Sequence, residues 1–433
     1  YQGRRQEVRL AYADRVTHVN LIGKTRVGKS TLLYQMAQQD IHAGKGVAVI
    51  DPHGDLVDQI MATSIPQERE QDVVLLDVAD RDHIIGLNLL ASPPGVPREV
   101  AASQALSVVR KLFADQWSAT RMEDALYAAL VSLISTGEAT LQDIPRLFSD
   151  PLFRQHVLSQ VSDPVTLEFW RQEYEPLSES HKREIARPVN TRIRKFYRNE
   201  TIRRIVCQPN CLDFRTIMDD GKIFLANLRG TTGIEGETLG ALLISQIQMA
   251  AMSRASDSPS RREPYYLFID EAQNFVTTSL PAMFSEAGKY GLSLILANQF
   301  LSQLTGETLE AVLGNVGTMI MFRVGPRDAQ ALHPFVKPHF TGEDLFNLNR
   351  FNAVVKMQHA GQTLPAFSMQ TQPPRPKPQD APERVERIRA VSREKYTLAK
   401  EVVDETINKR FQGIVYDTPS KPETKVREVN YFD

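Results

Sequence analysis

Residues 16–30 read VTHVNLIGKTRVGKS, a short apolar strand that runs directly into a glycine-rich loop. After the loop, Thr31 to His42 carries apolar residues at helical spacing, and Gly44 is a natural stop for such a helix. Backbone N–H groups of a loop in this setting, together with the helix N-terminus, form a nest that binds phosphate. The stretch therefore predicts a P-loop, with ATP as its ligand.

Two side chains of the loop carry the expected chemistry. Lys29 is placed to reach the β and γ phosphates, and the Ser30 hydroxyl to ligate Mg²⁺. Arg26 stands where many such loops have glycine, and a positive φ there would cost about 1 kcal/mol. A chance glycine–lysine turn is the alternative, although it leaves the flanking strand and helix unexplained. The residues expected at the nucleotide are Gly23, Lys24, Thr25, Arg26, Val27, Gly28, Lys29, Ser30 and Thr31.

A second element ends in two adjacent carboxylates. The apolar run from Tyr265 to Ile269 is followed at once by Asp270 and Glu271. A P-loop needs such an element, because in-line attack on the γ-phosphate requires a held metal and a positioned water. We expect Asp270 to hold Mg²⁺ through its water shell and Glu271 to orient or deprotonate the water. The alternative is a capping Asp-Glu pair after a core strand.

Other polar residues also follow apolar strands. Gln299 ends the run LSLILANQ and would sense the γ-phosphate if that strand lies beside the P-loop strand, or else is an ordinary loop residue. Asp51 and His53 follow another strand, where a contact near the ligand and a structural turn are both open. Arg323 and Arg327 follow a third strand and are candidates for an arginine finger. The alternative is that they are ordinary surface arginines.

The alternation of strands and helices predicts an α/β fold of the RecA-like P-loop type, with a mostly parallel central sheet. Residues 1–95 and 206–371 are expected to form the two parts of the RecA-like nucleotide-binding domain, with an all-helical insertion at 96–205 between them. Residues 372–433 form a proline-rich linker, a charged helix from Glu383 to about Phe411, and about twenty disordered or partner-dependent residues. The expected strands are Val16 to Ile22, Gly46 to Ile50, Val73 to Leu76, Lys222 to Leu228, Tyr265 to Ile269, Leu292 to Ala297, Thr318 to Phe322 and Val354 to Met357.

Charge and composition narrow the functional classes. A net charge of −1 means that nucleic-acid binding would have to rely on local patches. Residues 182–204 form such a patch, which is either a phosphate-binding surface or a solvated helical face. Cys207 and Cys211 are expected to be reduced thiols rather than zinc ligands, as in a cytoplasmic protein. No apolar run is long enough for a membrane span, and a start at Tyr1 leaves room for an upstream segment carrying a membrane anchor.

Taken together, the motifs resemble the HerA/FtsK superfamily of hexameric DNA-pumping ATPases. Within it the chain is most similar to the conjugative coupling proteins of type IV secretion, the TraG/TraD type with its TraM-recognition domain. The resemblance covers roughly residues 5 to 370 and includes the helical insertion. It rests on five stretches, which are GKTRVGKST (23–31), VAVIDPHGDL (47–56), FIDEAQNF (268–275), SEAGKYGLSLILANQFLSQL (285–304) and GNVGTMIMFRVGPRDAQAL (314–332).

The resemblance implies an ATPase that forms a ring, expected to be a hexamer, and threads single- or double-stranded DNA. It supports catalytic roles for Lys29, Glu271 and Gln299, with Arg323 acting on a neighbouring subunit. Gly288 departs from the family, which has arginine there beside Lys289. Relaxosome or secretion-channel proteins are the expected partners, at the inner face of the membrane. The alternatives are a HerA-like motor that works with a nuclease in repair or phage defence, and a nucleotide-gated assembly module without translocation.

Overall fold

A ten-stranded sheet forms the centre of this computed structural model, which describes residues 7–113, 120–231, 233–304 and 306–412. The strand order is β10-β9-β8-β1-β7-β6-β2-β5-β3, with β11 paired to β9. The last twenty or so residues, expected to be disordered or partner-dependent, lie outside the described residues. The strands are β1 (Val19–Ile22), β2 (Gly46–Asp51), β3 (Val73–Asp77), β5 (Ile223–Asn227), β6 (Tyr265–Ile269), β7 (Leu292–Asn298), β8 (Thr318–Met321), β9 (Asn352–His359), β10 (Gln362–Thr363) and β11 (Phe367–Gln370).

The sheet is parallel from β8 to β3, and the predicted α/β fold with a mostly parallel sheet is confirmed. Every residue of β1, β2, β5, β6 and β7 is buried, which explains why these strands read as continuous apolar runs. Only β9, β10 and β11 join the sheet in antiparallel fashion, at the edge beside β8.

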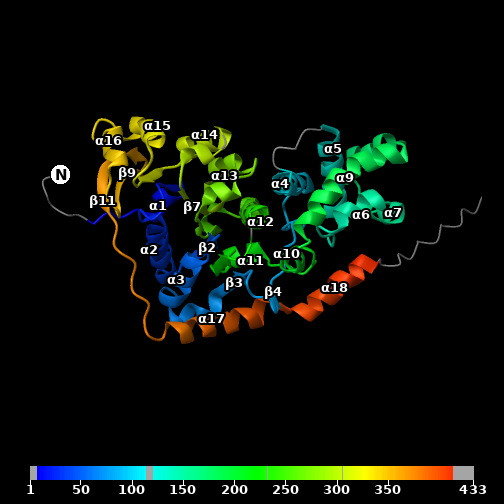
Figure 1. The fold of residues 1–433 in the computed structure, drawn as a ribbon, viewed down its shortest axis with the longest axis horizontal. Helices are drawn as coiled ribbons and strands as arrows, with labels where there is room; N and C mark the ends of the chain where they lie inside the picture. The colour runs from blue at the N-terminus through cyan, green and yellow to red at the C-terminus, as the bar shows by residue number, and fades with distance from the viewer. Residues whose placement is uncertain (1–6, 114–119, 232, 305, 413–433) are drawn as a thin grey trace, which may run out of the picture.

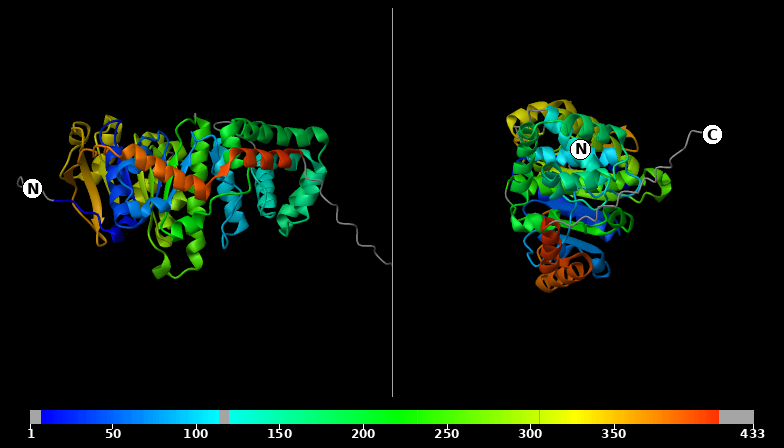
Figure 2. Two further views of the ribbon diagram at one scale, coloured as in Figure 1. Left: turned by 90° about the horizontal axis from the view of Figure 1, so that it is seen from below. Right: turned by 90° about the vertical axis from the view of Figure 1, so that its right-hand side faces the viewer.

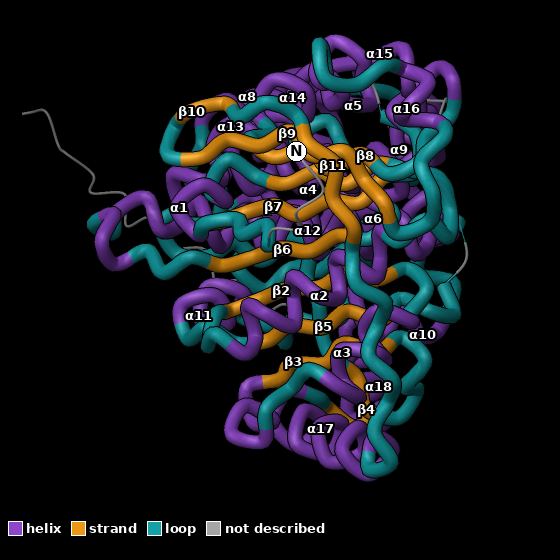
Figure 3. The backbone as a smooth tube through the Cα atoms, turned by 90° about the vertical axis from the view of Figure 1, so that its left-hand side faces the viewer, coloured by secondary structure: helices purple, strands orange, loops and turns teal. Residues whose placement is uncertain are grey.

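Helices cover both faces of the sheet, which Figure 3 shows face-on with its strands stacked from β9 to β3. Successive residues of β2 point to opposite sides: Val47 packs in the cluster that contains α2 (Lys29–His42) and α3 (Asp55–Thr63). Ala48 packs in the other cluster, with α12 (Ile234–Met252). The remaining helices around the sheet are α1 (Tyr12–Arg15), α11 (Phe214–Asp219), α13 (Leu280–Glu286), α14 (Gly306–Asn315), α15 (Pro326–Val336) and α16 (Gly342–Phe346).

The described part of residues 98–206 contributes helices and no strand, and it extends from one end of the molecule (Figure 1). Its core is continuous with that of the neighbouring sheet face, and Trp170 at its centre donates a 3.0 Å hydrogen bond to Ser132. The division of the chain into domains stays a prediction. The helices are α4 (Arg98–Lys111), α5 (Thr120–Ile134), α6 (Asp143–Ser149), α7 (Pro151–Leu158), α8 (Pro164–Glu168), the π-helical turn η3 (Phe169–Tyr174), α9 (Glu179–Phe196) and α10 (Glu200–Val206).

The single charged helix predicted from Glu383 to Phe411 is wrong. The segment forms two helices, α17 (Ala381–Tyr396) and α18 (Lys400–Gln412), and they run along the molecule from the sheet to the helical region (Figures 1 and 2). Between them Leu398–Ala399 is extended as β12 and pairs in antiparallel fashion with β4 (His83–Ile84). Helical periodicity carries no signal for this pairing, because the partner lies far away in the sequence. Nowhere in the described residues is a helix both long and apolar enough to span a membrane.

Candidate active site

The predicted P-loop connects the end of β1 to the start of α2 and has a strained backbone. Gly28 has φ of 122°, and a Cβ added there would lie 2.9 Å from Cδ1 of Phe351, so only glycine fits. Arg26 has φ of 60°, the positive value considered from the sequence. A non-glycine residue in this region costs about 1 to 2 kcal/mol. The loop thus keeps a conformation that its own sequence does not favour at Arg26.

Lys29 is nearly buried, with 5% of its surface exposed. Its ammonium donates hydrogen bonds to the carbonyl oxygens of Gly23, at 2.6 Å, and Lys24, at 3.0 Å. Burial lowers the pKa of Lys29, and the charges of Glu271 and Asp270 oppose that shift. The Lys29 ammonium is therefore held against the backbone of the P-loop. The two carboxylates are close enough to stabilise its positive charge.

Ser30 meets Asp270 across the sheet. The Ser30 hydroxyl donates a 2.8 Å hydrogen bond to Oδ2 of Asp270, and the Glu271 N–H donates to Oδ1 at 3.0 Å. Burial raises the pKa of Asp270 to about 6; the Ser30 hydrogen bond opposes the shift, and the charge of Glu271 adds to it. Hydroxyl and carboxylate oxygens suit Mg²⁺, which commonly takes one or two protein ligands together with phosphate oxygens and water. The pair predicted to lie at the metal is thus brought together.

Glu271 lies directly after Asp270 in a left-handed conformation, with φ of 50°. Non-glycine residues held in this region often mark functional positions, because the surrounding structure must offset the strain. Only 8% of Glu271 is exposed, and its Oε2 accepts a 2.6 Å hydrogen bond from the Gln273 amide. The carboxylate is therefore oriented by a neighbour that the sequence analysis did not single out.

Gln299 follows β7, which pairs in parallel with the P-loop strand β1, so the condition set for its sensing role is met. The register places Asn298 opposite Ile22, and the Gly23 N–H donates a 3.2 Å hydrogen bond to the Asn298 carbonyl. Gln299 is half-buried, and within the described part of the chain no residue hydrogen-bonds its side chain. Its amide is therefore available for a ligand at the P-loop.

Arg323 lies at the P-loop of its own chain, where its carbonyl oxygen accepts a 2.9 Å hydrogen bond from the Lys24 N–H. Its side chain is exposed, as is that of Arg327 in the first turn of α15. Both arginines thus remain able to reach a partner, and action on a neighbouring subunit stays a prediction.

Asp51 has a structural role. Its carboxylate accepts hydrogen bonds from the N–H groups of His53, at 2.9 Å, Leu56, at 2.8 Å, and Val57, at 3.1 Å. These bonds satisfy free donors at the start of α3. His53 is exposed, with its backbone engaged in this turn. Of the two interpretations left open for this pair, the geometry therefore favours the turn.

A buried amide pair that was not predicted from the sequence lies on β1 and β7, the strands behind the P-loop. Asn298 Nδ2 donates a 2.7 Å hydrogen bond to Oδ1 of Asn20, and both residues are fully buried. The available signal was Asn20 itself, a polar residue in an otherwise apolar strand. Phe351 was also missed; its N–H donates a 2.8 Å hydrogen bond to the Val27 carbonyl, and its ring packs on Gly28.

Comparisons with known proteins bear on the family resemblance and on the fold. Residues 264–335 match the family model described as the TraM recognition site of TraD and TraG. This segment contains Asp270, Glu271, Gln299 and Arg323. The resemblance to TraG/TraD-type coupling proteins is confirmed. A comparison with curated proteins found no match.

The coupling-protein fold extends over most of the chain. The unbound bacterial conjugative coupling protein TrwBdeltaN70 superposes with a TM-score of 0.60 at 14% identity, covering 83% of this chain and 85% of that one. TrwB in complex with ADP and Mg²⁺ gives 0.60 at 15% identity, covering 85% and 89%. VirB4 of Thermoanaerobacter pseudethanolicus gives 0.56 at 15%, covering 82% and 89%. Identities this low show a shared fold.

Proposed function

We propose that this chain is an ATP-hydrolysing DNA motor of the coupling-protein kind, active as a homo-oligomeric ring that is expected to be a hexamer. The observation that carries the proposal is the hydrogen bond between Ser30 and Asp270, with Glu271 adjacent, on the fold of a coupling protein. A nucleotide-gated module has no need of a catalytic base, whereas a motor must hydrolyse ATP and therefore needs one. TrwB structures with ADP and Mg²⁺ and with ATP and GTP analogues support a nucleotide at this site.

Each catalytic side chain has a definite task in this proposal. Lys29 exchanges its contacts with the loop carbonyls for oxygens of the β and γ phosphates. Ser30 and Asp270 would hold Mg²⁺, whose positive charge would offset that of the phosphates. Glu271 positions the attacking water and accepts its proton, and the hydrogen bond from Gln273 keeps the carboxylate in place.

Gln299 and Arg323 complete the proposed site. Gln299 lies one residue past the strand beside the P-loop strand and is proposed to sense the γ-phosphate. Arg323 is proposed to add positive charge in the transition state of a neighbouring subunit. Mixing Arg323→Ala with Lys29→Ala subunits tests this directly, because mixed rings recover activity only if the arginine acts across a subunit boundary.

The basic run of residues 182–204, which spans α9 and α10, supports DNA as the substrate. Among its cations in the described residues, Lys182 and Arg204 make ion pairs, whereas four exposed arginines have no carboxylate within 4.0 Å. The spacing of these four places them along one side of α9 and the turn after it. Such a stripe suits a row of phosphates. The four residues are Arg183, Arg187, Arg194 and Arg198.

The description of the matched family supports a proposal for partners and cellular location. The matched segment is named for recognition of TraM, so we propose relaxosome or secretion-channel proteins as partners. Work in the cytoplasm, at the inner face of the membrane, is proposed for the same reason.

ATP turnover of the purified chain, measured with and without DNA, tests the function. We expect DNA to stimulate hydrolysis, and electron micrographs with a non-hydrolysable ATP analogue to show rings with a central pore. Turnover that DNA leaves unchanged, with no DNA binding at low salt, would overturn the motor. Rings that form with nucleotide but do not hydrolyse it would instead support the assembly module.

A further inference from the structure

The C-terminal strap, residues 371–412, connects the P-loop region to the helical region of residues 98–206. It begins beside β9, crosses the molecule as α17 and ends as α18 on the helical region (Figures 1 and 2). Elsewhere the two regions share one continuous apolar core, and they are also joined by the segments near Gly86 and Asn210. There the backbone is so close that a Cβ on Gly86 would lie 1.8 Å from the Asn210 oxygen. The strap is an additional connection, made by backbone hydrogen bonds and by side chains.

The first end of the strap is attached to the P-loop by backbone hydrogen bonds. Val27 in the loop accepts a 2.8 Å hydrogen bond from the Phe351 N–H, and Phe351 accepts one of 2.8 Å from the Thr371 N–H. The Thr371 hydroxyl donates to the same Phe351 oxygen at 3.2 Å. The first residue of the strap is therefore separated from the P-loop by one residue, whose ring also packs on Gly28.

The next residues of the strap lie on α2 and α3, the helices that follow β1 and β2. Gln35 on α2 donates a 2.7 Å hydrogen bond to the Gln372 carbonyl. Gln59 on α3 donates a 3.0 Å hydrogen bond to the Arg375 carbonyl. Since α2 begins at the phosphate-binding loop, any shift of this helix acts directly on the strap.

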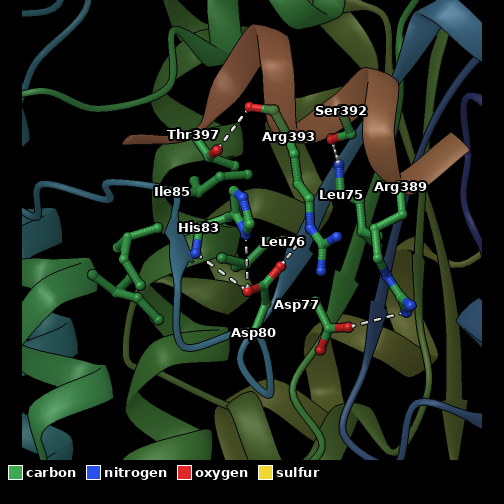
Figure 4. A pocket seen from close by; sticks show the side chains of 12 residues that line it. Leu75, Leu76, Asp77, Asp80, His83, Ile85, Arg389, Ser392, Arg393 and Thr397 are labelled. Atoms are coloured by element: carbon green, nitrogen blue, oxygen red, sulfur yellow. Dashed lines mark hydrogen bonds and ion pairs between the residues drawn. The ribbon is translucent and has the colours of Figure 1, made fainter. Parts of the chain in front are cut away.

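The middle of the strap covers the open edge of the sheet at β3, where an uncovered strand would expose unpaired backbone groups. Ser392 accepts a 2.8 Å hydrogen bond from the Leu75 N–H. Figure 4 shows this contact beside the ion pairs of Arg393 with Asp80, at 2.8 Å, and of Arg389 with Asp77, at 3.5 Å. These contacts hold α17 to the sheet along its length.

The far end of the strap is docked on the helical region. Arg204 on α10 makes two hydrogen bonds to the Asp404 carboxylate, at 2.7 and 2.9 Å. Arg410 donates a 2.6 Å hydrogen bond to the buried Asp143 at the start of α6. Val403 and Ile407 are buried in the cluster that also holds the helical region. Paired charges and apolar burial together make this a built interface.

We propose that the strap couples nucleotide occupancy of the P-loop to the position of the helical region. The inference rests on the proposed nucleotide binding. It adds a route by which binding at the P-loop changes the helical region. A change at Phe351 or α2 moves the start of the strap, the contacts with β3 keep α17 in register, and α18 carries the displacement to α10. Contacts are continuous over this route, which gives the coupling a physical path.

Hydrogen exchange of the full chain, with and without Mg²⁺ and a non-hydrolysable ATP analogue, tests the proposal. In the wild-type chain we expect nucleotide to slow exchange in the P-loop and to change it in α18 and α10 as well. Arg204→Glu should keep the P-loop response and lose the response in α10. Asp404→Asn is a milder second variant with the same expected loss.

Two further variants separate coupling from general damage. Adding Asp404→Arg to Arg204→Glu restores opposite charges and should restore the α10 response. Lys409→Gln removes an ion pair within α18, to Glu405, that does not touch the helical region, and should change nothing. A wild-type response confined to the P-loop, or one that reaches α10 in Arg204→Glu, would overturn the link. Absence of any P-loop response would overturn the proposed nucleotide binding and the link with it.

Discussion

The Ser30 hydroxyl donates a 2.8 Å hydrogen bond to the carboxylate of Asp270, a residue 240 positions later in the chain. Because both are oxygen ligands of the kind that Mg²⁺ takes, removing the hydroxyl should weaken binding of the Mg²⁺–nucleotide complex. For Ser30→Ala we expect affinity to fall by about tenfold or more, equivalent to about 1.4 kcal/mol. Ser30→Thr retains the hydroxyl and should bind like the wild type. Titration of a fluorescent ATP analogue, with Mg²⁺ and with EDTA, measures the affinity of both variants. Equal affinity of Ser30→Ala and wild type would show that Ser30 is not a ligand of the metal.

Glu271→Gln should abolish turnover while ATP binding persists. The amide keeps the shape of the side chain but cannot accept the proton of the attacking water, and loss of a general base typically costs about 10² to 10⁴ in rate. Gln273→Ala leaves the carboxylate without its 2.6 Å hydrogen bond and should lower turnover by a smaller factor. Steady-state phosphate release together with equilibrium binding separates the two effects. Wild-type turnover by Glu271→Gln would reject its assignment as the base.

Gly28→Ala should damage the P-loop more than a matched glycine change elsewhere. Its φ of 122° and the 2.9 Å approach of Phe351 leave no place for a methyl group. At Gly44, φ is 75° and nothing lies within 4 Å of an added Cβ, so Gly44→Ala meets backbone strain alone, about 1 to 2 kcal/mol. Urea unfolding and nucleotide binding measure the contrast. Similar losses for the two variants would mean that Phe351 does not restrict the loop.

His18 should make the stability of the chain fall in mild acid. Its Nδ1 accepts a 3.1 Å hydrogen bond from the Leu294 N–H and its Nε2 donates to the Phe284 carbonyl at 3.0 Å, so the buried ring is neutral. Burial lowers its pKa from 6.5 to about 4, and the Phe284 hydrogen bond opposes this shift. The unfolded chain therefore binds a proton first, and the contribution of His18 is complete above pH 6.5.

As pH falls from 6.5 to about 4, that contribution is lost, by an amount of ~3 kcal/mol. Urea unfolding at a series of pH values, compared between wild type and His18→Gln, isolates it from other titrating groups. The difference between the two proteins should shrink steadily across this window. A difference that does not vary with pH would show that His18 does not titrate as a buried neutral ring.

The arginine stripe on α9 should contribute to DNA affinity through phosphate contacts. Replacing Arg183 and Arg187 with Gln should weaken binding regardless of DNA sequence, and should reduce the slope of log affinity against log salt by about 2 for duplex DNA. Lys182→Gln is the matched control, because Lys182 already pairs with Glu175 and Glu179. Fluorescence anisotropy at several salt concentrations gives the slopes. An unchanged slope for the double variant would assign the stripe to a solvated surface.

Much of this fold could be read from the sequence because its signals are local. Continuous apolar runs mark β2 and β6, since both faces of a parallel sheet are covered. Glycine spacing marks the P-loop, and the Asp270–Glu271 pair follows directly from a strand end. These predictions need no knowledge of which strand lies beside which.

Other features depend on contacts between distant segments. The insertion of β7 between β1 and β6 places Gln299 one residue past the strand beside the P-loop strand, and the tertiary fold brings Asp270 to Ser30. The sequence pattern could not split the predicted charged helix into α17 and α18, because the break is made by pairing with β4. Nor could it separate the paired cations of residues 182–204 from the exposed ones, since their carboxylate partners include Asp404 at the other end of the chain.

The sequence by itself thus determined the elements and the type of chemistry, because hydrophobic periodicity and residue chemistry act over a few residues. Tertiary structure alone decided the strand order, the left-handed conformation of Glu271 and the path of the C-terminal strap. These result from hydrogen bonding and packing between residues far apart in the chain, and a local pattern does not specify its distant partner.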